Sequence, residues 1–132
     1  MTQHAELTGR IVRADDADQP GRERRVEPTV PHDPMAVGFA QQTGDVLNAQ
    51  AWARQNNVTV RVRSGRHCLE GWSNVDDGIA IDVSEMKSVT LDAASGTATV
   101  GAGLNQLEAV TALGMAGFAA PAAPTGGEGT SA

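Results

Sequence analysis

The pattern of hydrophobic and polar residues changes after the first quarter of the chain. Residues 1–33 are polar and show no periodicity, so we predict an irregular arm with one short strand at Gly9 to Val12. Pro28, Pro31 and Pro34 disfavour a helix at the end of this arm, because proline lacks the amide hydrogen that a helix needs. Beyond them the chain carries the periodic patterns of a folded domain.

A strand, a helix and a second strand are predicted between residues 35 and 62. MAVGF, at 35–39, is a short apolar run that favours a buried strand. VTVRV, at 58–62, alternates valines with Thr59 and Arg61, which predicts a strand with the three valines on one face. Together these segments form one βαβ unit.

The helix of this unit is expected at about 44–56. Thr43 offers a hydroxyl group for the N-cap, and Asp45 places a negative charge at the positive end of the helix. Asn56-Asn57 is the expected C-cap. The helical spacing predicts a buried face formed by Val46, Ala49, Trp52 and Ala53.

The second half of the chain predicts a strand, a β-hairpin and a helix. IAIDV, at 79–83, is a further alternating strand, and VTLD and TATV form a hairpin because the loop between them contains Gly96. The spacing of the apolar residues predicts a helix that Gly114 and Gly117 end; these residues are Leu104, Leu107, Val110 and Leu113. The predicted class is therefore α+β: a small βαβ unit followed by antiparallel strands and a helix.

Composition limits the chemistry that the chain can perform. The 132 residues fit one domain that can bury a core. The absence of tyrosine removes one common acid or base, and the single cysteine excludes an internal disulfide bond and a cysteine-based metal cluster. No metal site is predicted.

Charge and hydropathy limit the partners. Residues 1–66 carry a net charge of +1 and residues 67–132 a net charge of −7, so the second half does not favour contact with nucleic-acid phosphates. No segment approaches the roughly 20 apolar residues of a membrane span, and the first ten residues do not look like a signal peptide. We expect a soluble, cytoplasmic protein that binds neither nucleic acid nor membranes.

The segment RSGRH carries the chain's candidate chemistry. It follows a predicted strand, and Gly65 allows a ligand to approach the backbone closely. Ser64 adds a hydroxyl group, and Arg63 and Arg66 add positive charge. A Ser-Gly turn with inward amide groups can hold an anion such as phosphate. Trp72, just after this loop, is expected to anchor the turn.

Several longer strings give this loop a family context. SGRHCLEGWS, IAIDVSEMKSVTLD and GTATVGAG resemble the N-terminal FAD-binding segment of the vanillyl-alcohol oxidase and berberine-bridge-enzyme group, which has a p-cresol-methylhydroxylase-type fold. The segment from DPMAVGF to VRVRSG is similar to the strand, helix and strand that precede the loop. LTGRIVRADDAD and AAPTGGEGT are similar to the family's lead-in and its second FAD loop, so the resemblance covers nearly the whole chain.

The resemblance implies a set of cofactor-binding residues. In the family, the loop matching Arg63 to Cys68 wraps the pyrophosphate of FAD, and the histidine matching His67 is commonly bonded to the 8α carbon of the flavin. A neutral imidazole nitrogen near pH 7 is a fair nucleophile for such a bond. The implied residues are Arg63, Ser64, Gly65, Arg66, His67, Cys68, Gly126 and Thr130.

Two positions depart from the family pattern, and Cys68 is considered with them. Gly65-Arg66-His67 stands where many relatives have Gly-Gly-His, which adds a cation. Glu128 stands where some relatives carry a second flavin-linked cysteine, so a bicovalent flavin is not expected. Cys68 is not expected to reach the flavin together with His67, because neighbouring extended residues point in opposite directions. We expect it to be a small, partly buried apolar residue, since a reactive cysteine needs a specific electropositive setting.

The resemblance also implies that the domain is incomplete. Residues 34–132 match the N-terminal part of an FAD-binding domain, and the family continues into a substrate-binding domain that would hold the small-molecule substrate. The implied enzyme oxidises an alcohol, sugar or amine carbon by hydride transfer to flavin, with reoxidation by oxygen, and this chain alone would be inactive, with its catalytic residues unknown. We expect an N-terminal fragment, a truncated reading frame or one piece of a split protein. The alternatives are a non-catalytic nucleotide-binding or partner-completed module, and an inactive remnant that aggregates through exposed sheet edges.

Overall fold

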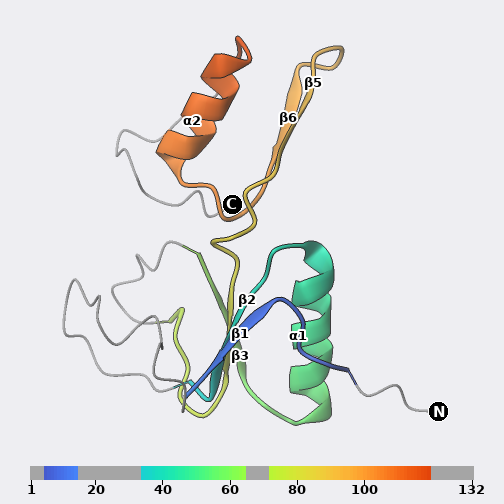
Figure 1. The fold of residues 1–132 in the computed structure, drawn as a ribbon, viewed down its shortest axis with the longest axis vertical. Helices are drawn as coiled ribbons and strands as arrows, with labels where there is room; N and C mark the ends of the chain where they lie inside the picture. Colours follow the sequence, from blue (N-terminus) through green and yellow to red (C-terminus); the bar gives the residue numbers. More distant parts are fainter. Residues whose placement is uncertain (1–4, 15–33, 65–71, 120–132) are drawn as a thin grey trace.

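A computed structural model describes residues 5–14, 34–64 and 72–119, and these form an α+β fold, as predicted (Figure 1). The two helices are α1 (Thr43–Gln55) and α2 (Gln106–Met115). The strands are β1 (Arg10–Arg13), β2 (Ala36–Phe39), β3 (Val60–Arg63), β4 (Ile79–Asp82), β5 (Val89–Asp92) and β6 (Thr97–Val100). No helix in these described ranges is long and apolar enough to cross a membrane.

Four strands form one mixed sheet in the order β1-β2-β4-β3. β2 and β3 each pair in parallel with β4, and β1 pairs antiparallel with β2. The predicted strand, helix and strand are confirmed, but β4 lies between the two strands of that unit. The short strand predicted near the start of the chain is also confirmed, and it forms one edge of the sheet.

The position of β4 explains its burial. The sequence predicted an alternating strand at 79–83, but all four residues of β4 are buried. On one face of β4, Ile79 and Ile81 pack in the core under α1, and on the other face Ala80 packs in a second buried cluster with strands β1 and β2, so the strand does not need a polar face. Val62 was predicted to face the core with the other valines, but it is 54% exposed, and β3 is an edge strand of the sheet that the described residues form.

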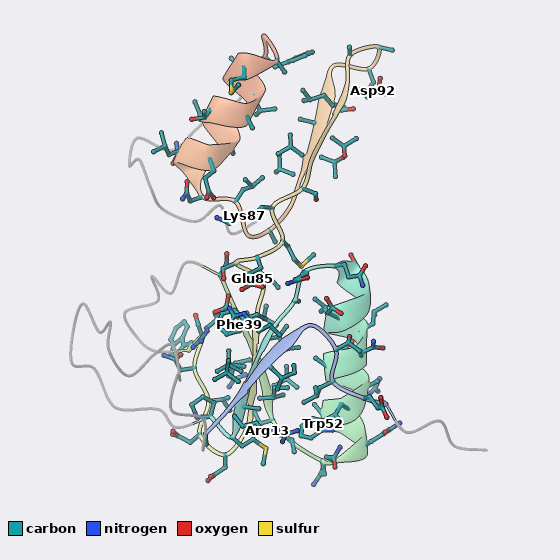
Figure 2. The ribbon with its side chains drawn as sticks, in the orientation of Figure 1. Arg13, Phe39, Trp52, Glu85, Lys87 and Asp92 are labelled. Carbon is teal, nitrogen blue, oxygen red and sulfur yellow. The ribbon has the colours of Figure 1, made fainter. Side chains whose placement is uncertain are left out.

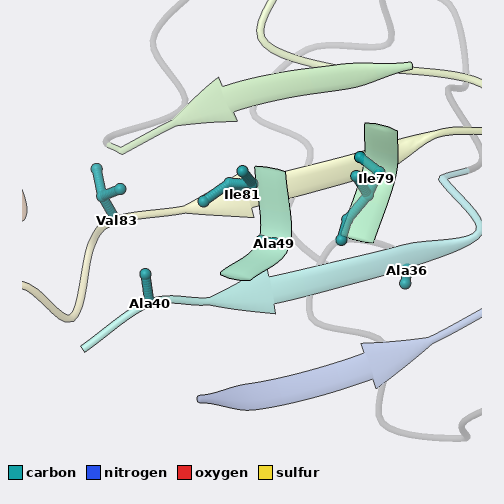
Figure 3. Close-up of a cluster of buried hydrophobic side chains, with 7 residues drawn as sticks. Ala36, Ala40, Ala49, Ile79, Ile81 and Val83 are labelled. Atoms are coloured by element: carbon teal, nitrogen blue, oxygen red, sulfur yellow. The ribbon is translucent and has the colours of Figure 1, made fainter. Parts of the chain in front are cut away.

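The main core lies between the sheet and α1, which covers one face (Figures 1 and 3). Alanines face each other here: Ala36 and Ala40 come from the sheet side, and Ala49 and Ala53 from α1. Their small side chains let the helix approach the sheet closely, and larger residues of β4 fill the space between them. Val46 and Trp52 pack against this cluster, so the predicted buried face of the helix is confirmed.

The ends of α1 differ from the prediction by one residue. Gln42, not Thr43, is the N-cap residue, and the helix begins at Thr43. Asp45 explains the shift, because its carboxylate accepts hydrogen bonds from the backbone amides of Gln41 (3.0 Å) and Gln42 (3.3 Å) and so fixes the turn before the helix. The predicted C-cap is confirmed at Asn56.

The hairpin and the second helix are confirmed, with one correction. β5 and β6 pair antiparallel, and Gly96 in their loop has φ +67°. Gly114 does not end α2, since the helix continues to Met115. It ends instead in a Schellman motif in which Gly117, with φ +80°, donates to the Gly114 carbonyl and Phe118 donates to the Leu113 carbonyl.

The chain passes from the sheet to the hairpin through residues 83–88, which lie against residues 101–103 of the segment before α2. We call this close contact the crossing. Figure 2 places Glu85 and Lys87 at this crossing, and Lys87 forms an ion pair with Glu108 at the start of α2. The Gly103 amide donates to the Met86 carbonyl (2.9 Å), and a Cβ atom on Gly103 would lie only 2.3 Å from the Val83 carbonyl oxygen. The crossing therefore brings the loop before α2 against the end of β4.

Candidate functional site

The three parallel strands end at one edge of the sheet. Phe39, Arg63 and Asp82 are the last residues of β2, β3 and β4, and they are in register across the sheet. Ligands of open α/β sheets bind outside the carboxyl ends of the strands. The segment that carries the predicted pyrophosphate loop leaves the sheet at this edge, directly after Ser64.

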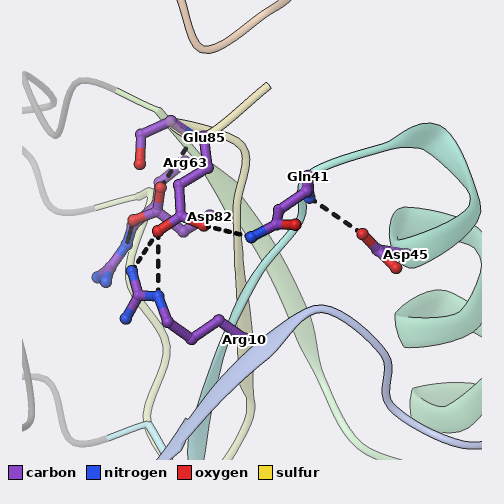
Figure 4. Close-up of polar contacts among 7 residues, drawn as sticks. Arg10, Gln41, Asp45, Arg63, Asp82 and Glu85 are labelled. Carbon is purple, nitrogen blue, oxygen red and sulfur yellow. Dashed lines mark hydrogen bonds and ion pairs between the residues drawn. The ribbon is translucent and has the colours of Figure 1, made fainter. Parts of the chain in front are cut away.

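A buried ion pair joins two of these strand ends (Figure 4). The Arg63 Nε atom lies 2.8 Å from the Asp82 Oδ2 atom, and the two side chains are 6% and 0% exposed. The other carboxylate oxygen of Asp82 accepts a hydrogen bond from the Ser84 amide (3.0 Å). The Arg63 Nη1 atom also donates to the Asn74 side-chain oxygen (3.4 Å), which links β3 to the residues that follow the loop.

Two further carboxylates at this edge are held by donors from β1 and its lead-in. Glu85 pairs with Arg10, whose guanidinium stacks 3.7 Å above the ring centroid of Phe39. Asp45 accepts a hydrogen bond from the Thr8 hydroxyl (2.7 Å). This bond and the bond from the Gln41 amide hold the pKa of Asp45 below its ordinary value.

Two of the predicted cofactor-binding residues lie in the described part of the chain. Arg63 is buried against Asp82, and Ser64 is half-buried, with its hydroxyl group donating to the Ala102 carbonyl (2.9 Å). The structure thus brings Ser64 to the crossing between the sheet and the hairpin. The remaining predicted residues lie outside the described ranges; these are Gly65, Arg66, His67, Cys68, Gly126 and Thr130.

The structure adds residues that the sequence interpretation missed. Asp82 and Asn74 hold Arg63, and neither was singled out as part of the site. Asp82 could have been found from the sequence, because it is an acid at the end of an otherwise apolar run, IAID. An acid in such a run is expected to be buried, and a buried acid needs a partner. Trp72 was expected to anchor the turn, but it is 76% exposed and contributes little buried surface.

The arrangement fits a bound anionic cofactor. The three carboxylates near the strand ends all accept hydrogen bonds or ion pairs from described donors, so their negative charge is compensated. Arg10 and Arg63 offset the charges of Glu85 and Asp82, and the α1 N-terminus offsets that of Asp45, so these groups leave no net positive potential of their own. A pyrophosphate group that approaches this edge would meet little uncompensated negative charge from the described side chains.

Comparisons with known proteins agree with this geometry. Residues 34–131 match a family model described as an FAD binding domain. Two curated relatives from Bacillus subtilis (strain 168) are similar: the uncharacterized FAD-linked oxidoreductases YgaK, 38% identical over 116 residues, and YvdP, 43% identical over 117 residues. Each match covers 88% of this chain and 26% of the relative, so the chain spans about a quarter of their length.

A solved structure shows the same arrangement of elements. The structure of 6-hydroxy-D-nicotine oxidase from Arthrobacter nicotinovorans superposes with a TM-score of 0.78 at 25% sequence identity. The match covers 91% of this chain and 26% of that one. The fold and the family match together define an FAD-binding domain of the p-cresol-methylhydroxylase type.

The chain belongs to the family of FAD-linked oxidoreductases that includes the vanillyl-alcohol oxidase and berberine-bridge-enzyme-like proteins. The predicted family and its cofactor, FAD, are confirmed.

Proposed function

We propose that this chain is the FAD-holding part of an oxidoreductase that removes a hydride from an alcohol, sugar or amine carbon. The observation that carries the proposal is the match of residues 34–131 to an FAD binding domain whose loop departs from the carboxyl edge of the parallel strands. FAD supplies the hydride acceptor, and molecular oxygen takes the electrons from it. The protein's part is to bind, orient and tune the cofactor.

The loop at 63–68 is the proposed pyrophosphate cradle. Its backbone amides would bind phosphate oxygens. The Ser64 hydroxyl group fixes the start of the loop through its hydrogen bond to the Ala102 carbonyl. Gly126 and Thr130 contribute a second contact with FAD. Support comes from the position of Ser64 at the strand edge where open sheets bind ligands.

His67 is the proposed covalent tether. His67 would hold the flavin through one imidazole nitrogen bonded to the 8α carbon, in place of a methyl C–H bond and the imidazole N–H bond. Oxygen would take up the two electrons and two protons released. A tether of this kind prevents loss of the cofactor and makes the flavin a stronger oxidant.

The substrate is proposed to bind elsewhere in the polypeptide. The chain spans about a quarter of the relatives that it matches, and the sequence singled out no catalytic acid or base within it. We therefore assign the small-molecule substrate to a further domain and expect residues 1–132 alone to be inactive. The name of the structural relative, a nicotine oxidase, supports an amine among the candidate substrates.

The proposal is tested on the purified product of the native gene. The denatured intact mass and the visible spectrum are measured for the wild type and for His67→Ala. A yellow wild type whose FAD mass survives denaturation, and a His67→Ala variant without that added mass, would support both the cofactor and the tether. Reversibly bound FAD would overturn the tether alone, and a colourless protein that does not bind added FAD would overturn the proposed function.

A further inference from the structure

We propose that Asp82 is a positioning residue for the cofactor loop, and that it acts through Arg63. In this role the Arg63 side chain holds the strand end from which the loop departs, and it does not serve as a ligand of the cofactor phosphates. The inference rests on the proposed function, because it assigns a role within the same FAD site.

The first support is the place of the pair in the fold. Arg63 is the last residue of β3, two positions before the segment 65–71, and Asn74 lies three positions after that segment. The guanidinium of Arg63 donates to both Asp82 and Asn74, at 2.8 Å and 3.4 Å. One side chain therefore connects the residue before the loop, the residues after it and the end of the central strand.

The second support is the backbone around the pair. The Arg63 carbonyl accepts a hydrogen bond from the Val83 amide (2.9 Å), and the Asp82 carboxylate accepts one from the Ser84 amide (3.0 Å). The Ser64 hydroxyl donates to the Ala102 carbonyl (2.9 Å). Main chain and side chains thus fix the same strand end, so the peptide that leads into the loop has a defined direction.

The third support is burial. Arginines that bind phosphate present their planar fork to an accessible ligand, whereas the side chain of Arg63 is only 6% exposed. Asp82 is 0% exposed, and a buried carboxylate needs a partner to offset its desolvation. Moving Arg63 toward a phosphate would separate this pair and leave Asp82 buried without its cation.

A double-mutant cycle separates the two roles of Arg63. FAD is titrated into flavin-free full-length protein carrying His67→Ala, which makes binding reversible, in combination with Asp82→Asn, Arg63→Met or both. A positioning role predicts that each substitution weakens FAD binding by roughly tenfold, and that the double variant binds no more weakly than either single variant. If the His67→Ala background retains no FAD, the moles of flavin per mole of purified protein are compared in the wild-type background.

Two controls separate positioning from general stability. Arg61→Met removes an exposed arginine two residues earlier on the same strand, and it should leave FAD binding unchanged. Ile79→Val destabilises the buried core of β4 away from the strand end. At a temperature well below all melting transitions, Ile79→Val should bind FAD like the parent protein while Asp82→Asn does not.

Several results would overturn the inference. If Arg63→Met weakens FAD binding while Asp82→Asn binds FAD like the parent, Arg63 contacts the cofactor directly. If Asp82→Asn does not fold, Asn74→Ala decides, because it removes only the link across the loop, and unchanged FAD binding in that variant would refute positioning. A wild-type protein that carries no flavin and does not bind added FAD would instead refute the proposed function.

Discussion

Single polar residues at the carboxyl edge depend on partners that are distant in the sequence. Asp45 is an example: its carboxylate accepts hydrogen bonds from two neighbouring amides and from Thr8, which lies 37 residues earlier. Asn48 donates to the same Thr8 hydroxyl group (3.0 Å). The start of α1 is thereby tied to the segment that leads into β1.

Asp45→Asn should lower the free energy of unfolding by about 1 kcal/mol at neutral pH, as for other lost helix caps. The new amide group replaces one accepting oxygen with a donor, so it cannot accept from Thr8 and the backbone amides together. Urea denaturation of both proteins measures the difference.

The difference should also depend on pH in a defined direction. Hydrogen bonds from Thr8, and then from the Gln41 amide, hold the pKa of Asp45 below its ordinary value of 3.8. Its contribution is therefore complete above that value and is lost as the pH falls through the lower pKa of the folded state. The two unfolding free energies should converge in acid, and a constant gap at all pH values would contradict this assignment.

For single residues, the sequence predicted the place of a residue in its helix or strand better than the residue with which its side chain pairs. It placed Asp45 at the start of a helix, and it placed Arg63 at a strand end beside a candidate anion loop. The pattern assigned the charge of Arg63 to a phosphate because the nearest reactive residues follow it directly. Its partner Asp82 comes 19 residues later, and the spacing of residues along the chain does not encode which strands are neighbours.

Among the elements, the tight crossing before α2 makes the strictest demand on sequence. Gly103→Ala would place a Cβ atom 2.3 Å from the Val83 carbonyl oxygen and 2.6 Å from that of Ser84. Because both contacts are with backbone atoms, the main chain must shift, and the expected cost is about 1–3 kcal/mol of unfolding free energy. Thermal or urea unfolding measures the loss.

Gly114→Ala is the matched control. Gly114 lies inside α2, and among the described residues an added Cβ atom would meet nothing within 4 Å apart from the helix's own backbone. Alanine favours a helix interior over glycine by up to about 1 kcal/mol, so this variant should be as stable as the wild type or more stable. Equal effects of the two glycine substitutions would mean that the crossing is not as tight as the structure shows.

The sequence predicted the strands and helices well, but it did not predict their neighbours. The hydrophobic patterns predicted α1, the hairpin and the strand at 79–83, because each pattern reflects local periodicity. They did not indicate that β4 lies between β2 and β3, since that order depends on how the helix crosses the sheet. They also predicted a row of apolar residues along α2, but two residues of that row, Leu107 and Val110, are 64% and 45% exposed.

Across the whole molecule, burial is unequal. The four-stranded sheet and α1 enclose the main core, whereas all four residues of β6 are exposed and Met115 on α2 is 87% exposed. Figure 1 shows the hairpin and α2 projecting beyond the carboxyl edge of the sheet. The site residues thus lie where a well-packed unit joins a less enclosed one.

Hydrogen exchange of the 132-residue chain should reproduce this difference. Amides of β2 and β4 should exchange at least about tenfold more slowly than those of β5 and β6, because a two-stranded hairpin with no fully buried residue in either strand opens easily. The helices provide an internal control, with α1 protected more strongly than α2. Equal protection of the two helices would show that the hairpin and α2 are held as firmly as the sheet.

The position of β4 also bears on how the molecule is made. Protein synthesis proceeds from the N-terminus, so β2 and β3 leave the ribosome before the strand that separates them. Until residues 79–82 emerge, the two strands cannot take up their final register, and their inner edges lack hydrogen-bond partners. The proposed pyrophosphate loop lies between β3 and β4 in the chain, so the strand end before it is completed only after the loop itself has been synthesised. Assembly of the proposed cofactor site would therefore follow, and could not precede, the arrival of the central strand.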